Sequence, residues 1–302
     1  MSTIKRMLAV TYHGVMDQQL VANAKLDAQE RIMASGVEIR VLVGVTEQDF
    51  AREIFDEVWP TNEGTQITAN LLQAMAHNGT YVSGVFVEGE IVGAAFAFPG
   101  VDEHGHLHLH SHMAAVKENF RDRSIGSTLK WHQRAWAMER GYEVITWTFD
   151  PLVRRNARLN LVKLGVRVFD YFPNFYGDLP DALNAGDPTD RAIARWDLLS
   201  QSTLSAASYR NLEQISDEIP VALSNIEGKP VQHGVGPSHR QVLCYLPSDI
   251  IEIRSQDSAL ALEWRLALRA ELLPRLESDW HIAGFTHDGA YLVTKSGMDE
   301  VK

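Results

Sequence analysis

A strand-like segment that runs directly into a helix-like segment is the feature that most constrains the fold of this chain. Apolar and polar residues alternate over residues 106–116, and from residue 124 to 141 the apolar residues fall close to helical spacing. Between the two segments lie Arg121, Arg123 and a turn of small residues. The first turn of such a helix leaves backbone N–H groups without partners. Together with two guanidinium groups, these donors suit a pyrophosphate.

The composition is that of a soluble globular protein. At 302 residues the chain exceeds the usual single domain, so one large domain or a core with a second lobe is expected. The formal charge of −11 argues against a general nucleic-acid surface. Cys244 is the only cysteine, which excludes an intrachain disulfide framework. No apolar run is long enough for a signal sequence or a membrane span. We therefore expect a cytoplasmic protein without nucleic-acid or membrane partners.

The chain before and after this segment predicts a mixed α/β fold. Residues 1–36 are predicted to form a polar helical lead-in that ends at Gly36. The remaining predicted elements, in order, are a strand at 38–44, helices from 46 and at 66–77, a hairpin at 81–98, a strand at 143–149, a helix at 154–164, and strands at 166–172 and 192–199.

The residues from about 201 onward predict a C-terminal β-α-β-β lobe. A strand is predicted at 239–246 and a closing hairpin at 281–294. The helix predicted at 258–276 has a broad apolar face, so we expect it to be well buried. The lobe could cap a substrate cleft, form a dimer interface or extend the sheet, and a homodimer is one of the open alternatives.

The arginine turn resembles the cofactor-binding motif of the GNAT acetyltransferase superfamily, Arg/Gln-x-x-Gly-x-Gly/Ala. Val116 stands five residues before Arg121, Ser124 replaces the first glycine, and Gly126 keeps the second. A turn that needs φ > 0 at Ser124 would disfavour serine. Residues 154–165 resemble the fourth GNAT helix, in which an asparagine, here Asn156, contacts the cofactor. Residues 37–200 as a whole resemble a GNAT domain, and the chain resembles a group of bacterial acetyltransferases with a C-terminal extension.

This resemblance implies acetyl-CoA as cosubstrate and a mixed sheet flanked by helices. In many members a tyrosine four residues before the closing glycine of the fourth helix protonates the departing thiolate, but here that position is Leu161. Water, Tyr171 or Tyr176 could supply the proton instead, or none is needed. The residues that the resemblance assigns to the cofactor are Ala114, Val116, Arg121, Arg123, Ser124, Ile125, Gly126, Ser127 and Asn156.

The alternating histidines at positions 104 to 112 admit three interpretations. A metal site is one, since His-x-His is a ligand spacing, but we do not expect a metal. For His104 and His106 we favour partly buried strand residues with satisfied nitrogens. For His110 and His112, catalysis ranks level with that interpretation, because imidazole can take the proton of an attacking amine. His110 has the offset at which some family members carry a glutamate base, and His112 lies nearer the expected thioester.

The leading functional hypothesis is direct transfer of an acetyl group from acetyl-CoA to a primary amine of a small molecule, in a ternary complex. His110 or His112 would act as base, and Tyr176, in an aromatic and acidic insert at 173–190, would contact the amine. One alternative is a non-catalytic acyl-CoA-binding or partner-binding protein on the same scaffold. A weaker alternative is a metal hydrolase that uses the histidines of residues 106–112.

Overall fold

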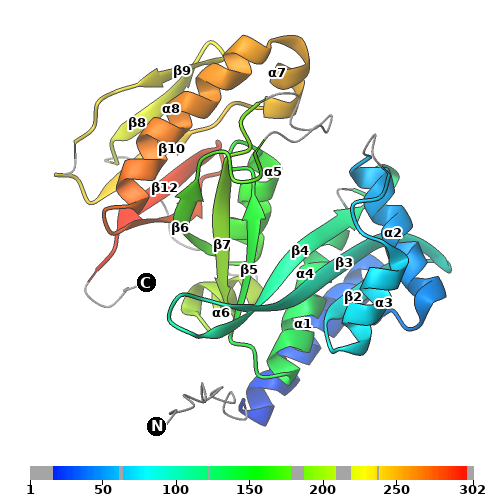
Figure 1. Cartoon of the computed structure of the whole chain (residues 1–302). Helices are drawn as coiled ribbons and strands as arrows, with labels where there is room; N and C mark the ends of the chain where they lie inside the picture. The colour runs from blue at the N-terminus through cyan, green and yellow to red at the C-terminus, as the bar shows by residue number, and fades with distance from the viewer. Residues whose placement is uncertain are drawn as a thin grey trace, which may run out of the picture.

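One mixed β-sheet runs through the chain (Figure 1). The computed structural model describes residues 16–60, 64–121, 123–177, 187–208, 219–236 and 238–297. The sheet has twelve strands in the order β1-β2-β3-β4-β5-β7-β6-β11-β12-β10-β8-β9. The strands are β1 (Glu38–Val41), β2 (Tyr81–Val87), β3 (Glu90–Val101), β4 (Leu107–Val116), β5 (Val144–Phe149), β6 (Arg167–Phe172), β7 (Arg191–Asp197), β8 (Val221–Ile226), β9 (Lys229–Gln232), β10 (Gln241–Tyr245), β11 (Trp280–Phe285) and β12 (Ala290–Lys295).

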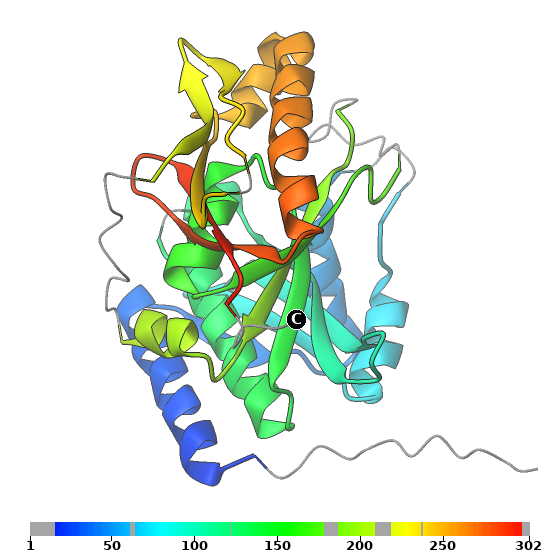
Figure 2. The same cartoon turned by 90° about the vertical axis from the view of Figure 1, so that its left-hand side faces the viewer.

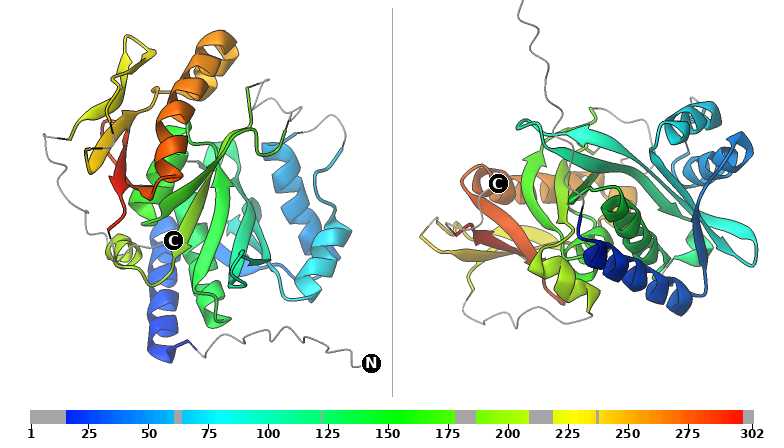
Figure 3. Two further views of the ribbon diagram at one scale, coloured as in Figure 1. Left: turned by 60° about the vertical axis from the view of Figure 1, so that its left-hand side comes forward. Right: turned by 90° about the horizontal axis from the view of Figure 1, so that it is seen from below.

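Helices cover the two faces of the first strands differently. On one face, α2 and α3 pack over β2 to β4 around a core that includes Phe55, Leu72 and Phe96. On the other face, α1 and α4 lie side by side (Figure 3), and Leu129 and Trp131 belong to the larger core there. The helical elements are α1 (Gln18–Ser35), α2 (Val45–Val58), α3 (Ala69–His77), η1 (Glu118–Phe120), α4 (Ile125–Glu139), α5 (Arg154–Ala157), η2 (Arg158–Lys163), α6 (Gln201–Ala207), α7 (Ile250–Gln256) and α8 (Ser258–Leu276).

Local sequence signals explain several of these boundaries. Gly36 ends α1 in the left-handed conformation, and Thr68 caps α3 by accepting the N–H of Leu71. Gly165 follows η2 with φ 73°, and a Cβ there would lie 2.4 Å from the carbonyl oxygen of Ser202, so only glycine fits. The predicted element order from β1 to β7 is confirmed. The predicted lead-in corresponds to α1, although residues 1–15 lie outside the described residues.

The C-terminal lobe extends the sheet. Its β11 pairs with β6 through Ile282 and Val168, and β12, β10, β8 and β9 continue outward. Figure 2 shows α7 and α8 standing together beside these outer strands. The predicted strand, long helix and closing hairpin are present, whereas β8, β9 and α7 were not predicted. The prediction was incomplete because β8 and β9 are short and joined by the tight turn Glu227-Gly228, in a segment whose composition is typical of loops.

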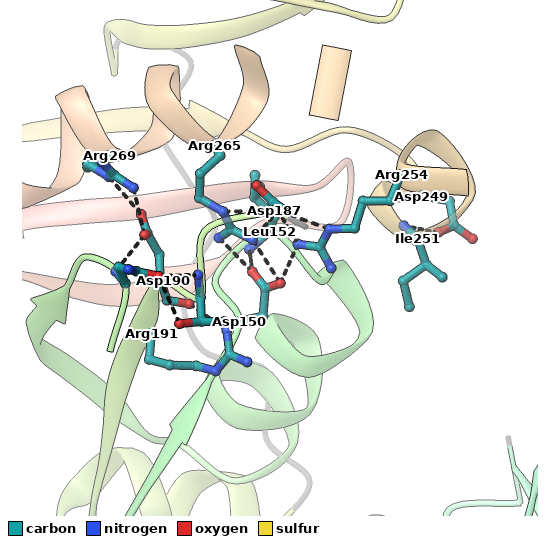
Figure 4. Close-up of polar contacts among 12 residues, drawn as sticks. Asp150, Leu152, Asp187, Asp190, Arg191, Asp249, Ile251, Arg254, Arg265 and Arg269 are labelled. Atoms are coloured by element: carbon teal, nitrogen blue, oxygen red, sulfur yellow. Dashed lines mark hydrogen bonds and ion pairs between the residues drawn. The ribbon is translucent and has the colours of Figure 1, made fainter. Parts of the chain in front are cut away.

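A buried ionic cluster joins the lobe to the strands before it (Figure 4). Arg265 of α8 donates to both carboxylate oxygens of Asp150, at 2.9 and 3.0 Å, and to Asp187 at 2.8 Å. Arg254 of α7 pairs with the same two aspartates. Burial raises the pKa of Asp150, but Arg265 and Arg254 outweigh it and hold that pKa well below its usual value. The lobe is therefore attached by charges that water does not reach.

Candidate active site

Strands β4 and β5 diverge part-way along their length. They pair in parallel only at Leu109 with Ile145 and at His110 with Thr146. Beyond His110, β4 continues to Val116 in register with β3 alone. The edge of β4 that faces β5 therefore has no strand partner after His110. These last residues of β4 lead toward the N-terminus of α4. Unpaired strand backbone of this kind can donate to a carbonyl oxygen.

A β-bulge at His112 changes which face the side chains of β4 occupy. Ser111 pairs with Ala97 and Met113 pairs with Phe96, which leaves His112 as the extra residue. Before the bulge, Ser111 faces α4, whereas after it Met113 packs with the α2 and α3 core. Strict alternation would place the histidines, Ala114 and Val116 on one face. The bulge instead separates them.

The two candidate catalytic histidines lie together on the α2 and α3 face. Their ring centroids are 6.1 Å apart, and both rings contact Phe98, at 5.3 Å from His110 and 5.7 Å from His112. Ala114 and Val116 pair with Ala95 and Gly93 and lie on the opposite face, toward α4. A molecule held on the α4 face and one held beside the histidines would thus meet at the gap between β4 and β5.

The histidines differ in their surroundings. His110 is half-buried, and its Nδ1 atom lies 3.0 Å from the Oγ1 atom of Thr146. Burial lowers the pKa of His110 to about 4, with His112, His108 and Lys130 contributing in the same direction. His112 is the more exposed, and burial alone lowers its pKa. Both rings are therefore neutral at pH 7 and able to accept a proton, and His112 is the freer of the two.

His104 and His106 are not strand residues, so the interpretation favoured for them was wrong. Both are exposed in the turn before β4, where Asp102 accepts their backbone N–H groups at 2.9 and 2.8 Å. This carboxylate-capped turn, with Gly105 at φ 84°, ends the alternation. Within the described ranges, no three His, Cys, Asp or Glu side chains come together in an arrangement that could hold a metal ion.

The turn before α4 gathers the predicted phosphate-binding residues. Ser124 adopts φ 60° despite being serine, and its carbonyl oxygen accepts the N–H of Thr128, which is the first bond of the helix. The side chain of Ser124 makes no capping bond, so the N–H groups of the first turn, Ile125 to Ser127, have no partner within the helix. A Cβ built on Gly126 would meet no atom within 4 Å. The helix N-terminus is thus open to an anion.

The two arginines flank this helix N-terminus. The Nε atom of Arg121 lies 3.4 Å from the Val116 carbonyl oxygen, and its guanidinium is 3.7 Å from the exposed Glu118. Arg123 is exposed, with its guanidinium 5.1 Å from the ring centroid of Phe120. Neither arginine is buried or held by a short ion pair among the described residues. Both can turn toward a bound phosphate.

The helix after β5 differs from the predicted regular helix. After α5, residues Arg158–Lys163 form a π-helix. Leu161 is buried in the core, and Asn156 is half-buried on α5. Sequence reasoning missed Asn160, which is 2% exposed and whose Nδ2 atom has no partner among the described residues. No local pattern signals a π-helix, so this residue could not be found from the sequence.

The two candidate tyrosines have different positions. The Tyr176 hydroxyl lies 2.9 Å from the Oγ1 atom of Thr148 on β5, and the guanidinium of Arg191 lies 5.4 Å from the Tyr176 ring. Tyr171 is buried and donates to Asp190 at 2.5 Å, and burial and that carboxylate raise the pKa of Tyr171 far above its usual value. Tyr176 therefore reaches the face of the histidines, whereas Tyr171 belongs to the core.

Lys130 of α4 is a buried amine that the sequence reasoning did not single out. It is 5% exposed, donates to the Oγ atom of Ser111 at 2.6 Å, and lies 3.9 Å from the ring centroid of Trp147. Burial lowers the pKa of Lys130 to about 7. The signal was available, because Lys130 stands between Leu129 and Trp131 on the helix that covers the sheet.

Comparison with known proteins identifies the domain. Residues 48–165 match the model of the acetyltransferase (GNAT) family. These residues form a GNAT domain. The match covers β2 to β5, the helix up to Gly165, and the cradle, which consists of Arg121, Arg123 and the first turn of α4. The GNAT domain therefore contains both the gap between β4 and β5 and the bulge at His112. No curated protein matches the chain. Within the described ranges, no helix combines the length and apolar character that crossing a bilayer requires.

Solved GNAT structures resemble about half of the chain. The protein yncA from Salmonella typhimurium, determined with acetyl-CoA, is 18% identical, covering 55% of this chain and 95% of its own, with TM-score 0.46. A GNAT acetyltransferase from Elizabethkingia anophelis, also with acetyl-CoA, is 17% identical, covering 54% and 99%, with TM-score 0.42. One from Streptococcus pneumoniae is 13% identical, covering 53% and 97%, with TM-score 0.43. These likenesses are weak, and the family assignment depends on the sequence match.

Proposed function

We propose that the chain transfers an acetyl group from acetyl-CoA to a primary amine of a small molecule, by direct attack within a ternary complex. The observation that carries the proposal is the bulge at His112. It directs the histidines to one face of β4 and leaves Ala114 and Val116 on the face of the α4 cradle. Acetyl-CoA as acyl donor and the amine as acyl acceptor, on opposite faces of β4, could then react at the gap between β4 and β5 without competing for space.

The cradle fits the diphosphate of acetyl-CoA. The first turn of α4 offers free N–H donors and the positive end of its dipole, and Arg121 and Arg123 add two guanidinium groups. The open surface at Gly126 lets a phosphate approach the backbone. Asn156, with Asn160 one helical turn later, offers amide groups from the helix after β5. These residues would hold the cofactor while the acyl group enters the gap.

The chemistry requires a base and a donor to the developing oxyanion. His112 is neutral at pH 7 and would take a proton from the attacking amine, while His110 is held by Thr146 and positions its neighbour. The amine nitrogen forms the C–N bond, the C–S bond breaks, and the CoA thiolate leaves. Unpaired backbone N–H groups between Met113 and Val116 would stabilise the oxyanion. The thiolate is a good leaving group, so it would depart without a dedicated acid at Leu161.

A calorimetric titration with acetyl-CoA and with CoA tests the cradle. We expect micromolar binding to the wild type and binding at least roughly tenfold weaker to Arg123→Ala, because a charge-assisted contact to phosphate is lost. Arg240→Ala is the matched control, since Arg240 is an exposed arginine of the C-terminal lobe. Equal affinity in Arg123→Ala and the wild type would show that the cradle lies elsewhere.

A non-catalytic acyl-CoA-binding protein is the second candidate, favoured by the burial of Leu161 in the core where many members carry a tyrosine. Release of free thiol from acetyl-CoA, measured across a panel of primary amines, separates the two candidates. An enzyme releases CoA in proportion to acetylated amine. A binding protein shows the affinity without any amine-dependent release.

A further inference from the structure

A row of four side chains runs across neighbouring strands from β4 to β6, on the sheet face opposite α1 and α4. His110 of β4 is in register with Thr146 of β5, and Thr146 is in register with Arg195 of β7. Arg195 in turn is opposite Arg167 of β6. Residues directly opposite each other on neighbouring strands share a face. Since neighbouring strands lie about 4.8 Å apart, the backbones of His110 and Arg195 are separated by roughly 10 Å.

This face is accessible to a small molecule. Along β7, Ala192, Ala194 and Trp196 are fully buried, whereas Arg195 is exposed. Thr148, two residues after Thr146 and on the same face, contacts the exposed Tyr176. The helices α4 and α1 lie on the other face, and α2 and α3 cover β2 to β4 (Figure 1). The row is thus a continuous surface that leads from the histidines to two arginines.

Arg195 lies directly opposite a second arginine, Arg167. Like charges directly opposite each other on antiparallel strands destabilise a sheet. No ion pair or hydrogen bond of Arg195 is present in the described part of the chain, and its positive charge acts on His108. Asp197, two residues from Arg195 along β7, and Asp170, opposite Ile193, lie on the same face, and neither makes an ion pair with Arg195. An exposed arginine without an ion pair, beside a candidate active site, is suited to binding an anionic ligand.

We propose that the acyl acceptor is an amine that also carries an oxyanion, a carboxylate or a phosphate, which Arg195 and Arg167 bind while the amine lies at His112. The proposal rests on the acetyl transfer proposed above. Arginine suits this role because its planar fork binds carboxylate and phosphate through two parallel hydrogen bonds. The length of the row limits the size of the acceptor. It must be a small molecule whose amine reaches the histidines while its anionic group reaches the arginines. The arginines therefore select the acceptor, whereas the histidines take its proton.

The test compares matched amines that differ only in the anionic group. Thiol release from acetyl-CoA is measured with 4-aminobutanoate against 4-aminobutanamide, tyrosine against tyrosinamide, and phosphoethanolamine against ethanolamine. We expect at least one anionic amine to react with a kcat/KM roughly 10- to 100-fold above its neutral partner, mainly through a lower KM. Arg195→Gln should remove that preference, Arg195→Lys should keep part of it, and Arg240→Gln should leave it unchanged. The pair of amines that shows this preference identifies the bound group as a carboxylate or a phosphate.

Each other outcome overturns the proposal in a recognisable way. Equal or better turnover of the neutral amines would refute the anion site and leave acetyl transfer standing. An anionic preference that persists in Arg195→Gln and in Arg167→Gln would refute the assignment to these arginines. Binding of acetyl-CoA without thiol release from either set would refute both this inference and the enzymatic function.

Discussion

The Nζ atom of Lys130 lies 2.6 Å from the Oγ atom of Ser111, one residue before the bulge at His112. The amine is buried, and its other contacts are Trp147 at 3.9 Å and Gln133 at 3.3 Å. No carboxylate pairs with Lys130 among the described residues. The helix α4, whose N-terminus forms the cradle, therefore also contacts the strand beside the bulge through Lys130. Burying this amine without a carboxylate partner costs free energy of folding.

Lys130→Met should change how stability depends on pH. Burial lowers the pKa of Lys130 from 10.5 to about 7, so between these values the unfolded chain binds a proton that the folded chain does not. The free energy of unfolding of the wild type should rise over this range, by up to about 1.4 kcal/mol per pH unit more than that of the variant. Urea unfolding of the wild type and the variant at several pH values measures this difference in the free energy of unfolding. Parallel curves for the two proteins would contradict the assignment.

His112→Ala should lower turnover and spare cofactor binding. Loss of a general base costs roughly 10²- to 10⁴-fold in rate, while the ring lies on the face of β4 opposite Ala114 and Val116. Because burial lowers the pKa of His112, wild-type kcat/KM should fall as acid protonates the ring, and this acidic limb should be absent from the variant. His104→Ala, in the exposed turn, is the control. A retained acidic limb in His112→Ala would point to another base.

Arg265→Met should destabilise the attachment of the C-terminal lobe. The variant leaves Asp150 and Asp187 buried with Arg254 as the remaining arginine that pairs with both, which costs roughly 3–5 kcal/mol. Because the folded pKa of Asp150 is lowered, the ion pairs stabilise the fold above pH about 4, and this contribution is lost below it. Chemical denaturation at pH 7 measures the change. Asp150→Asn combined with Arg265→Met should recover part of the loss, and an additive double variant would argue against coupling.

Ser124→Gly and Ser127→Gly should have opposite effects on stability. Ser124 adopts φ 60° without a side-chain capping bond, so glycine relieves backbone strain and should stabilise by up to about 1 kcal/mol. Ser127 lies within the first turn of α4, where glycine costs about 1 kcal/mol. Thermal unfolding of the two variants compares them directly. A loss of stability in Ser124→Gly would mean that the serine hydroxyl contributes to the turn.

The order of the elements from β1 to β7 followed from the sequence because each has its own local signal. Gly36 and Gly165 mark helix ends, and alternation marks the strand of the histidines. The sequence could not show the bulge at His112, because a bulge depends on register with β3 and leaves the alternation of residue types intact. The row from His110 to Arg167 depends likewise on long-range pairing, and the π-helix around Asn160 has no local signal in the sequence. The faces and neighbours of the predicted site residues therefore required the structure, as did the identification of Asn160, Lys130 and Arg195.

The two ends of the twelve-stranded sheet limit how copies of the chain can associate. At one end β1 has four residues, and Arg40 is tied to Glu47 at 2.8 Å. At the other end β9 also has four residues and contains Pro230, which has no N–H to donate. Short edges that carry charge or proline resist edge-to-edge growth. The two ends of this sheet are therefore poor templates for a continuous β-aggregate, and they disfavour a dimer formed by pairing β1 or β9 of two copies.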